Sequence, residues 1–149
     1  MKQMLFVCTG NTCRSPMAQA IYNALTDPQQ TRAASAGLMA LPDAPASAQA
    51  VEAVKTLLGA DLSTHRARRL TAQMVREADH IICMGQAHAQ AVKAMADDPQ
   101  KVETLMQWAY GKPGDIPDPY GQSVAVYLAC ARELEGAIRA GLHRMDDRK

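Results

Sequence analysis

The apolar residues of the chain fall into short runs that alternate with segments of helical spacing. The first run, residues 3–8 (QMLFVC), predicts a buried strand. Ser15 then offers an N-cap with Pro16 at the first helical position, and Asp27-Pro28 ends the predicted helix. The predicted inward face of that helix consists of Met17, Ala20, Ile21, Ala24 and Leu25. The chain therefore begins with a strand, a turn and an amphipathic helix.

The same alternation continues to the C-terminus. Further strands are predicted at residues 31–37, 79–84 and 101–105. The remaining helices are predicted up to Leu58 before Gly59, from the cap Thr71 to near Ala78, over residues 86–96, and after a Gly/Pro-rich loop at 110–121. Inward positions are Val51, Val54 and Leu58 in the second helix, and Tyr127, Cys130, Leu134 and Ile138 in the last.

Four strands and about five helices, with no internal repeat or linker, predict one domain over residues 1–149. Strands that alternate with helices favour the α/β class, here a three-layer, doubly wound, four-stranded parallel sheet. Ligands bind such sheets at the carboxyl ends of the strands. Cys8 lies at one of these ends, so the turn that follows it is a candidate site.

Composition adds few constraints. The chain is 48% hydrophobic and 21% charged with a formal net charge of +1, which favours neither nucleic acid nor an anionic membrane as a partner. The basic stretch Arg66-Ala-Arg68-Arg69 is interpreted as a solvated face. Lys2 precedes only a short apolar run, so neither a signal peptide nor a membrane span is expected, and we predict a cytoplasmic protein.

The four cysteines do not follow the spacing of a metal site. Cys8, Cys13, Cys83 and Cys130 form no CxxC pair and have no histidine at zinc-finger spacing, so no metal and no cofactor are expected. Cys83 and Cys130 lie in apolar patterns and are predicted to be core residues.

The turn after the first strand carries the pattern C-x5-R followed by serine, from Cys8 to Arg14 and Ser15. Backbone N–H groups of such a turn can surround an anion at a helix N-terminus, and Gly10 and Asn11 tolerate the left-handed conformations that this requires. Arg14 can bind two phosphate oxygens at once, and the positive surroundings favour the thiolate of Cys8. Chance occurrence of the pattern is the alternative, because C-x5-R alone is loose.

A cysteine nucleophile also needs a general acid for the leaving group. The segment GDIPDPYG, residues 114–121, supplies Asp115 and Asp118 on a loop stiffened by proline and glycine. An acidic solvent-exposed turn is the commoner interpretation of such a segment. Its position after a predicted strand makes it a candidate partner of Cys8.

With these pieces together, the chain resembles the low-molecular-weight protein tyrosine phosphatase family. The resemblance rests on VCTGNTCRSP near the N-terminus, SAG at 35–37, THRARRLT at 64–71, ADHIICM at 78–84 and DPYG at 118–121. It implies a flavodoxin-like fold and a phosphoprotein substrate. The implied roles are nucleophile for Cys8, phosphate clamp for Arg14, thiolate stabiliser for Ser15 and general acid, then base, for Asp118. It further implies that Asn11, Ser35 and His65 form a buried polar network behind the phosphate-binding residues Thr9, Gly10, Asn11, Thr12 and Cys13.

Two loop residues refine this picture. The family uses the second loop cysteine, here Cys13, for a reversible disulfide with the nucleophile Cys8, which would protect the nucleophile from over-oxidation; a structural thiol is the alternative. Thr12 replaces the apolar residue, commonly isoleucine, of many tyrosine-specific members and resembles the protein-arginine phosphatase branch. A hydroxyl and a shorter side chain suit the broad, polar guanidinium of phosphoarginine. The expected substrate rim consists of Thr12, Leu41 and Tyr120, with Leu38 and Met39 as possible additions.

Three alternatives stay open. Phosphotyrosine is the competing substrate if Thr12 is only a β-branched loop residue. A thiol-dependent arsenate reductase has the same fold, but its relay needs further cysteines after the third strand, and residues 85–96 contain none. An inactive phosphate-binding module would have lost Cys8 or Asp118, and both are present. A monomer is favoured, although nothing in the sequence fixes the oligomeric state.

Overall fold

A parallel sheet of four strands forms the centre of the molecule. The structure is a computed structural model that describes residues 1–147. The strands are Lys2–Cys8 (β1), Thr31–Gly37 (β2), His80–Cys83 (β3) and Val102–Thr104 (β4), and their order in the sheet is β2-β1-β3-β4. All pairs are parallel, so the carboxyl ends of β1 and β3 lie side by side.

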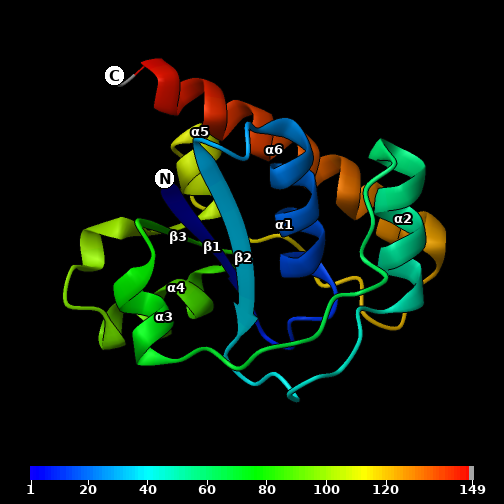
Figure 1. Cartoon of the computed structure of the whole chain (residues 1–149), viewed down its shortest axis with the longest axis horizontal. Coiled ribbons are helices and arrows are strands. Elements are labelled where there is room, and N and C mark those ends of the chain that lie inside the picture. Colours follow the sequence, from blue (N-terminus) through cyan, green and yellow to red (C-terminus); the bar gives the residue numbers. More distant parts are fainter. Residues whose placement is uncertain (148–149) are drawn as a thin grey trace.

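Helices cover both faces of this sheet, which confirms the predicted three layers (Figure 1). One layer holds Arg14–Leu25 (α1), Ala48–Leu58 (α2), Leu105–Tyr110 (α5) and Val124–Asp147 (α6). The other holds Ala72–Glu77 (α3) and Gln86–Met95 (α4). A short 3₁₀ turn, Pro99–Lys101 (η1), precedes β4.

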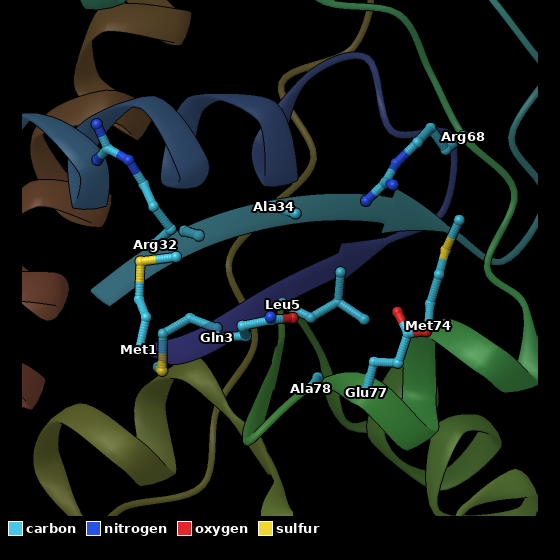
Figure 2. Close-up of a pocket in the computed structure, with 11 residues that line it drawn as sticks. Met1, Gln3, Leu5, Arg32, Ala34, Arg68, Met74, Glu77 and Ala78 are labelled. Atoms are coloured by element: carbon cyan, nitrogen blue, oxygen red, sulfur yellow. The ribbon is translucent and has the colours of Figure 1, made fainter. Parts of the chain in front are cut away.

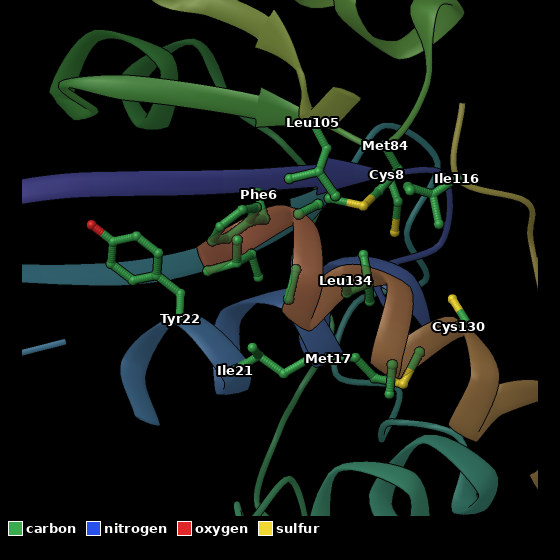
Figure 3. Packing of buried hydrophobic residues seen from close by; sticks show 14 of the residues in the cluster. Phe6, Cys8, Met17, Ile21, Tyr22, Met84, Leu105, Ile116, Cys130 and Leu134 are labelled. Atoms are coloured by element: carbon green, nitrogen blue, oxygen red, sulfur yellow. The ribbon is translucent and has the colours of Figure 1, made fainter. Parts of the chain in front are cut away.

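Alternation along β1 divides the core between the two faces. Phe6 and Cys8 belong to the apolar cluster under α1 and α6, where they pack near Met17 and Leu134 (Figure 3). Val7 belongs to the smaller cluster under α3 and α4. Because successive strand residues point to opposite faces, the last residue of β1 is fixed on the α1 side of the sheet.

The start of α1 differs from the prediction. The helix begins at Arg14, with Cys13 at the N-cap position, and Ser15 lies one residue inside it. The serine hydroxyl does not cap the helix because it bonds to Cys8 and Asn11 instead. The buried face is also shifted from the prediction, since Ala24 is exposed and Ala18 is buried.

The segment between β4 and the Gly/Pro-rich loop forms a helix that was not predicted. In α5, Thr104 accepts a hydrogen bond from the backbone N–H of Gln107, and Gly111 ends the helix in the left-handed conformation with φ 68°. Residues 1–147 thus hold six α-helices rather than five. Two predicted helix ends are confirmed, with Thr71 capping α3 and Gly59 ending α2.

The α3 side leaves part of β2 uncovered. A cavity of about 280 Å³ lies there between the strand and α3, lined by Leu5, Ala34 and Met74 among others (Figure 2). It borders the first half of β1 and is separate from the cavity at Cys8. Within residues 1–147, no helix combines the length and the apolar character needed to cross a membrane.

Candidate active site

A cavity of about 200 Å³ opens at the carboxyl end of β1. Every residue from Cys8 to Arg14 lines it, and the loop before α6 contributes Asp118 and Tyr120. Residues 9–13 make the turn that joins β1 to α1. The structure therefore brings Asp118 to Cys8 and Arg14, from which it lies more than a hundred positions away in the sequence.

The turn at residues 9–13 has features of an anion-binding loop. Asn11 adopts the left-handed conformation with φ 56°, as predicted, whereas Gly10 does not. The backbone conformation therefore does not require glycine at position 10. Among the described residues, no backbone N–H of residues 9–13 donates to another group of the protein. Unpaired N–H groups at a helix N-terminus are suited to bind an anion.

The Cys8 sulfur has a hydrogen-bond donor beside it. Ser15 Oγ lies 2.8 Å from Cys8 Sγ and accepts a hydrogen bond of 2.9 Å from Asn11 Nδ2. Because Asn11 occupies a lone pair of the hydroxyl oxygen, the hydroxyl proton is free to point at the sulfur. Ser15 is thus placed to donate a hydrogen bond to the Cys8 sulfur.

Arg14 is held at the back of the cavity. One end of its guanidinium, Nη1, donates to the Ile116 carbonyl at 3.0 Å, and Nη2 lies 3.6 Å from the Asp118 carboxylate. Its Nε is buried and has no partner among the described residues. A buried donor without a partner is costly, and Arg14 lines a cavity in which an anion could bind to its guanidinium.

The structure separates the two candidate acids. Asp118 is half exposed and lines the cavity. Asp115 does not line it; its Oδ1 accepts from the backbone N–H of Gln86 at 2.9 Å, at the start of α4. Asp115 therefore anchors the loop, and Asp118 is the carboxylate at the site.

Loop support comes from residues 65–68. His65 Nε2 donates to the Asn11 carbonyl at 2.8 Å, and the Arg68 backbone N–H donates to Asn11 Oδ1 at 2.9 Å. Burial lowers the pKa of His65, and the charges of Arg68 and Arg66 lower it further, against the opposing effect of the Asn11 hydrogen bond.

Ser35 takes part differently from the prediction. Its hydroxyl donates to Gln19 Oε1 at 2.6 Å, and its backbone carbonyl accepts from the Arg68 guanidinium at 3.3 Å. Ser35 thus reaches Asn11 through Arg68 rather than directly. Arg68, assigned to a solvated face from the sequence, therefore supports the loop.

Two further residues at the site were missed. A Cβ on Gly37 would lie 2.6 Å from the Thr9 carbonyl, so only glycine allows β2 to approach the loop this closely. His88 Nε2 lies 2.8 Å from Thr9 Oγ1. The signal for His88 was its place just after the predicted strand 79–84, whose carboxyl end meets the same edge of the sheet.

The second loop thiol is held by α6. Cys13 Sγ lies 3.2 Å from the Tyr127 hydroxyl and 3.7 Å from Ser47 Oγ. Burial and the hydrogen bond to Cys13 raise the pKa of Tyr127 to about 12, so the phenol keeps its proton. Cys13 is therefore buried and hydrogen-bonded on the side of α6, while it also lines the cavity that contains Cys8.

The expected rim is only partly at the cavity. Thr12 and Tyr120 line it, and Tyr120 is largely exposed. Leu41 and Met39 are exposed but do not line it. Thr12 Oγ1 has one weak partner, Cys13 Sγ at 3.7 Å, and no backbone group pairs with it among residues 1–147. Its hydroxyl is available at the cavity.

Residues 3–149 match the family described as low molecular weight phosphotyrosine protein phosphatase. The chain belongs to this family. The phosphatase is 35% identical over 140 residues to the protein-arginine-phosphatase of Bacillus subtilis (strain 168), covering 91% of each. It is also 35% identical over 144 residues to the probable low molecular weight protein-tyrosine-phosphatase EpsP of Ralstonia solanacearum, covering 97% of this chain and 96% of that protein.

A solved structure of the YwlE arginine phosphatase, a Cys-to-Ser mutant with a phosphorylated active site serine, superposes with a TM-score of 0.90. The identity is 33%, over 97% of this chain and 95% of that chain. The protein is therefore a low-molecular-weight cysteine-dependent protein phosphatase. Among residues 1–147, no group of three or more His, Cys, Asp or Glu side chains is arranged to hold a metal ion.

Proposed function

We propose that this phosphatase hydrolyses phosphoarginine in proteins through a phosphocysteine at Cys8. The observation that carries the chemistry is the shared cavity of Cys8, Arg14 and Asp118. The observation that carries the substrate is the Thr12 hydroxyl, which lines the cavity and has only the weak contact with Cys13 Sγ at 3.7 Å. Relatives named for arginine and for tyrosine are equally similar to the chain, so overall identity does not choose between them.

In the first step the Cys8 thiolate attacks phosphorus, and the bond from phosphorus to the leaving nitrogen breaks. Arg14 and the loop N–H groups hold the phosphoryl oxygens, which gain negative charge. Asp118 gives its proton to the leaving guanidinium nitrogen. The products of this step are dephosphorylated arginine and phosphocysteine.

In the second step water replaces the sulfur. The Asp118 carboxylate takes a proton from the water, whose oxygen bonds to phosphorus while the phosphorus–sulfur bond breaks. The thiolate returns to the hydrogen bond with Ser15, and inorganic phosphate leaves. One carboxyl group thus serves as acid and then as base.

The rim supports an arginine substrate. A guanidinium is wide and offers several donors, whereas a tyrosine ring is flat and apolar. The half-exposed Asp118 carboxylate can accept from it, and the exposed Tyr120 ring can stack on its plane. The short Thr12 side chain leaves space and adds a hydroxyl.

The test compares phosphoarginine and phosphotyrosine peptides of one sequence. We expect a higher kcat/KM for phosphoarginine in the wild type, and Thr12→Ile to lower that value about tenfold while sparing phosphotyrosine, since a pocket separates polar from apolar groups mainly through its hydrogen bonds. Thr12→Val removes the hydroxyl at nearly constant shape and is the matched control. If the wild type prefers phosphotyrosine and Thr12→Ile leaves that preference unchanged, the substrate assignment is contradicted.

We also infer that Cys13 protects Cys8. Peroxide would oxidise the Cys8 thiolate to sulfenic acid, and Cys13 would attack that sulfur with loss of water to form a disulfide. Mild peroxide should therefore give a Cys8–Cys13 disulfide that thiols reduce, read by peptide mass spectrometry. Sulfonic acid at Cys8 with Cys13 still reduced would contradict the protective role.

A further inference from the structure

His88 joins α4 to the loop that carries the nucleophile. It lies in the first turn of α4, and its Nε2 is 2.8 Å from the hydroxyl of Thr9, the residue after Cys8. The start of α4 is itself fixed, because Asp115 accepts from the Gln86 backbone N–H and packs against Gly85. His88 therefore connects the start of α4, which Asp115 anchors, to the turn that follows the nucleophile.

The surroundings of His88 are charged on two sides. The positive charge of Arg14 in α1 and the negative charges of Asp115 and Asp118 in the loop before α6 act on its ring. The second ring nitrogen, Nδ1, is buried and has no hydrogen-bond partner in residues 1–147. His88 does not line the cavity, so its influence on substrate must pass through Thr9 and through its charge.

The geometry points to His88 as a positioning residue of the phosphate loop: it holds Thr9 beside the nucleophile, and its protonation is linked to the anion bound in the cavity. The inference rests on the proposed function in one respect, that residues 8–14 bind a phosphate-like anion.

The hydrogen bond and the charge make separate contributions. A threonine hydroxyl can donate or accept, so its bond to Nε2 persists whether the ring is neutral or protonated. Burial lowers the pKa of His88, Arg14 lowers it further, and Asp115 and Asp118 oppose these effects. An anion beside Arg14 offsets the positive charge of that guanidinium and so favours the protonated ring. By reciprocity, protonation of His88 must tighten anion binding by the same factor.

Sulfate is the appropriate probe, because it stays a dianion throughout the range in which histidine titrates. Its competitive inhibition constant would be measured between about pH 5 and pH 8 for the wild type and for His88→Asn. We expect sulfate to bind the wild type about fivefold tighter at the acid end than His88→Asn does, at the lower limit of typical coupling between sites. His143→Asn, which removes an exposed histidine of α6, is the control and should follow the wild type.

Histidine NMR tests the same linkage from the other side. The chain has four histidines, and His88→Asn assigns the relevant signals. Saturating sulfate should raise the pKa of His88. The expected rise is the base-ten logarithm of the factor by which protonation of His88 tightens sulfate binding to the wild type. Unchanged titration of His88, in protein that binds sulfate, overturns the inference and leaves the proposed function standing. Sulfate that fails to bind at any pH contradicts both.

Rescue separates the hydrogen bond from the charge. His88→Ala should lower kcat/KM about tenfold, mainly by raising KM, because Thr9 loses its partner. His88→Asn keeps a polar partner for Thr9 and should recover most of this loss at neutral pH, but without the increase in affinity at acid pH. Equal losses in both variants with unchanged pH profiles would overturn the positioning role.

Discussion

Cys8 and Cys83 end neighbouring parallel strands, and both are almost completely buried. Cys83 pairs with Val7, one residue before Cys8, so the two sulfurs occupy opposite faces of the sheet. Around Cys83 the neighbours are apolar, and burial raises its pKa to about 12. Cys8, in contrast, contacts the Ser15 hydroxyl and lines the same cavity as Arg14 and Asp118.

The comparison teaches that burial alone does not decide what a cysteine can do. Nearly equal exposure accompanies opposite environments, because one strand ends in an open polar turn and the other beneath α4. Cys130 lies in surroundings like those of Cys83, since burial raises the pKa of Cys130 to about 12 as well. The following predictions test the contrast between Cys8 and Cys83.

The largest effect is expected from the nucleophile. Cys8→Ser should lower turnover of para-nitrophenyl phosphate by about a thousandfold or more, since loss of a catalytic nucleophile removes the covalent route. Cys83→Ala should stay within about twofold in kcat/KM and lose about 1–2 kcal/mol of stability from its small cavity. Steady-state kinetics and urea unfolding measure both. A comparable loss of turnover in Cys8→Ser and Cys83→Ala would contradict the different roles given to Cys8 and Cys83.

The two aspartates should divide catalysis from anchoring. Asp118→Asn should slow turnover of a phosphorylated peptide, whose leaving group needs a proton, by about a hundredfold, the loss expected for a general acid. Asp115→Asn should change kcat little but cost about 1 kcal/mol of stability, because it weakens the acceptor at the start of α4. An Asp118→Asn effect below threefold would move the acid role to another group.

Gly37 should affect the Cys8 turn through shape alone. Gly37→Ala places a Cβ 2.6 Å from the Thr9 carbonyl and should cost about 1–3 kcal/mol while lowering kcat/KM, because the turn must shift. Gly59→Ala is the control: its φ is 66° with nothing within 4 Å, so it should cost about 1 kcal/mol and spare turnover. Equal kinetics in the two variants would contradict the role given to Gly37.

The smallest effect concerns acid stability. The pKa of His65 is lower in the folded protein than its ordinary value of 6.5, so the unfolded chain binds the proton more readily below that pH. Stability should therefore fall as the pH drops below about 6.5. His65→Gln keeps a donor for the Asn11 carbonyl and should flatten this fall in urea unfolding. An unchanged pH dependence would contradict it.

The sequence predicted β1 and β3 well because their apolar runs are buried against a core on both faces of the sheet. It predicted the Cys8 turn because Cys8, Arg14 and Ser15 are local to one another. The α1 start was wrong, since the Ser15 hydroxyl serves the sulfur and not the helix end. The α5 helix was missed although Thr104 and Gly111 carried its cap signals.

Contacts between distant segments could not be predicted from local patterns. His88 meets Thr9 across 79 positions, and Ser35 bonds to Gln19 rather than to Asn11. Asp115 and Asp118 have the same chemistry three residues apart. Only the path of the loop across α4 shows which of them reaches the cavity.

The most direct test of the central claim is to trap the covalent intermediate. Nitrophenolate leaves without much help from an acid, so Asp118→Asn should still form phosphocysteine from para-nitrophenyl phosphate but release it slowly. Rapid acid quenching and peptide mass spectrometry should then find one phosphoryl group on Cys8 and none on Cys83. Continued turnover with no phosphoryl group on Cys8, or with the group on another residue, would contradict the account.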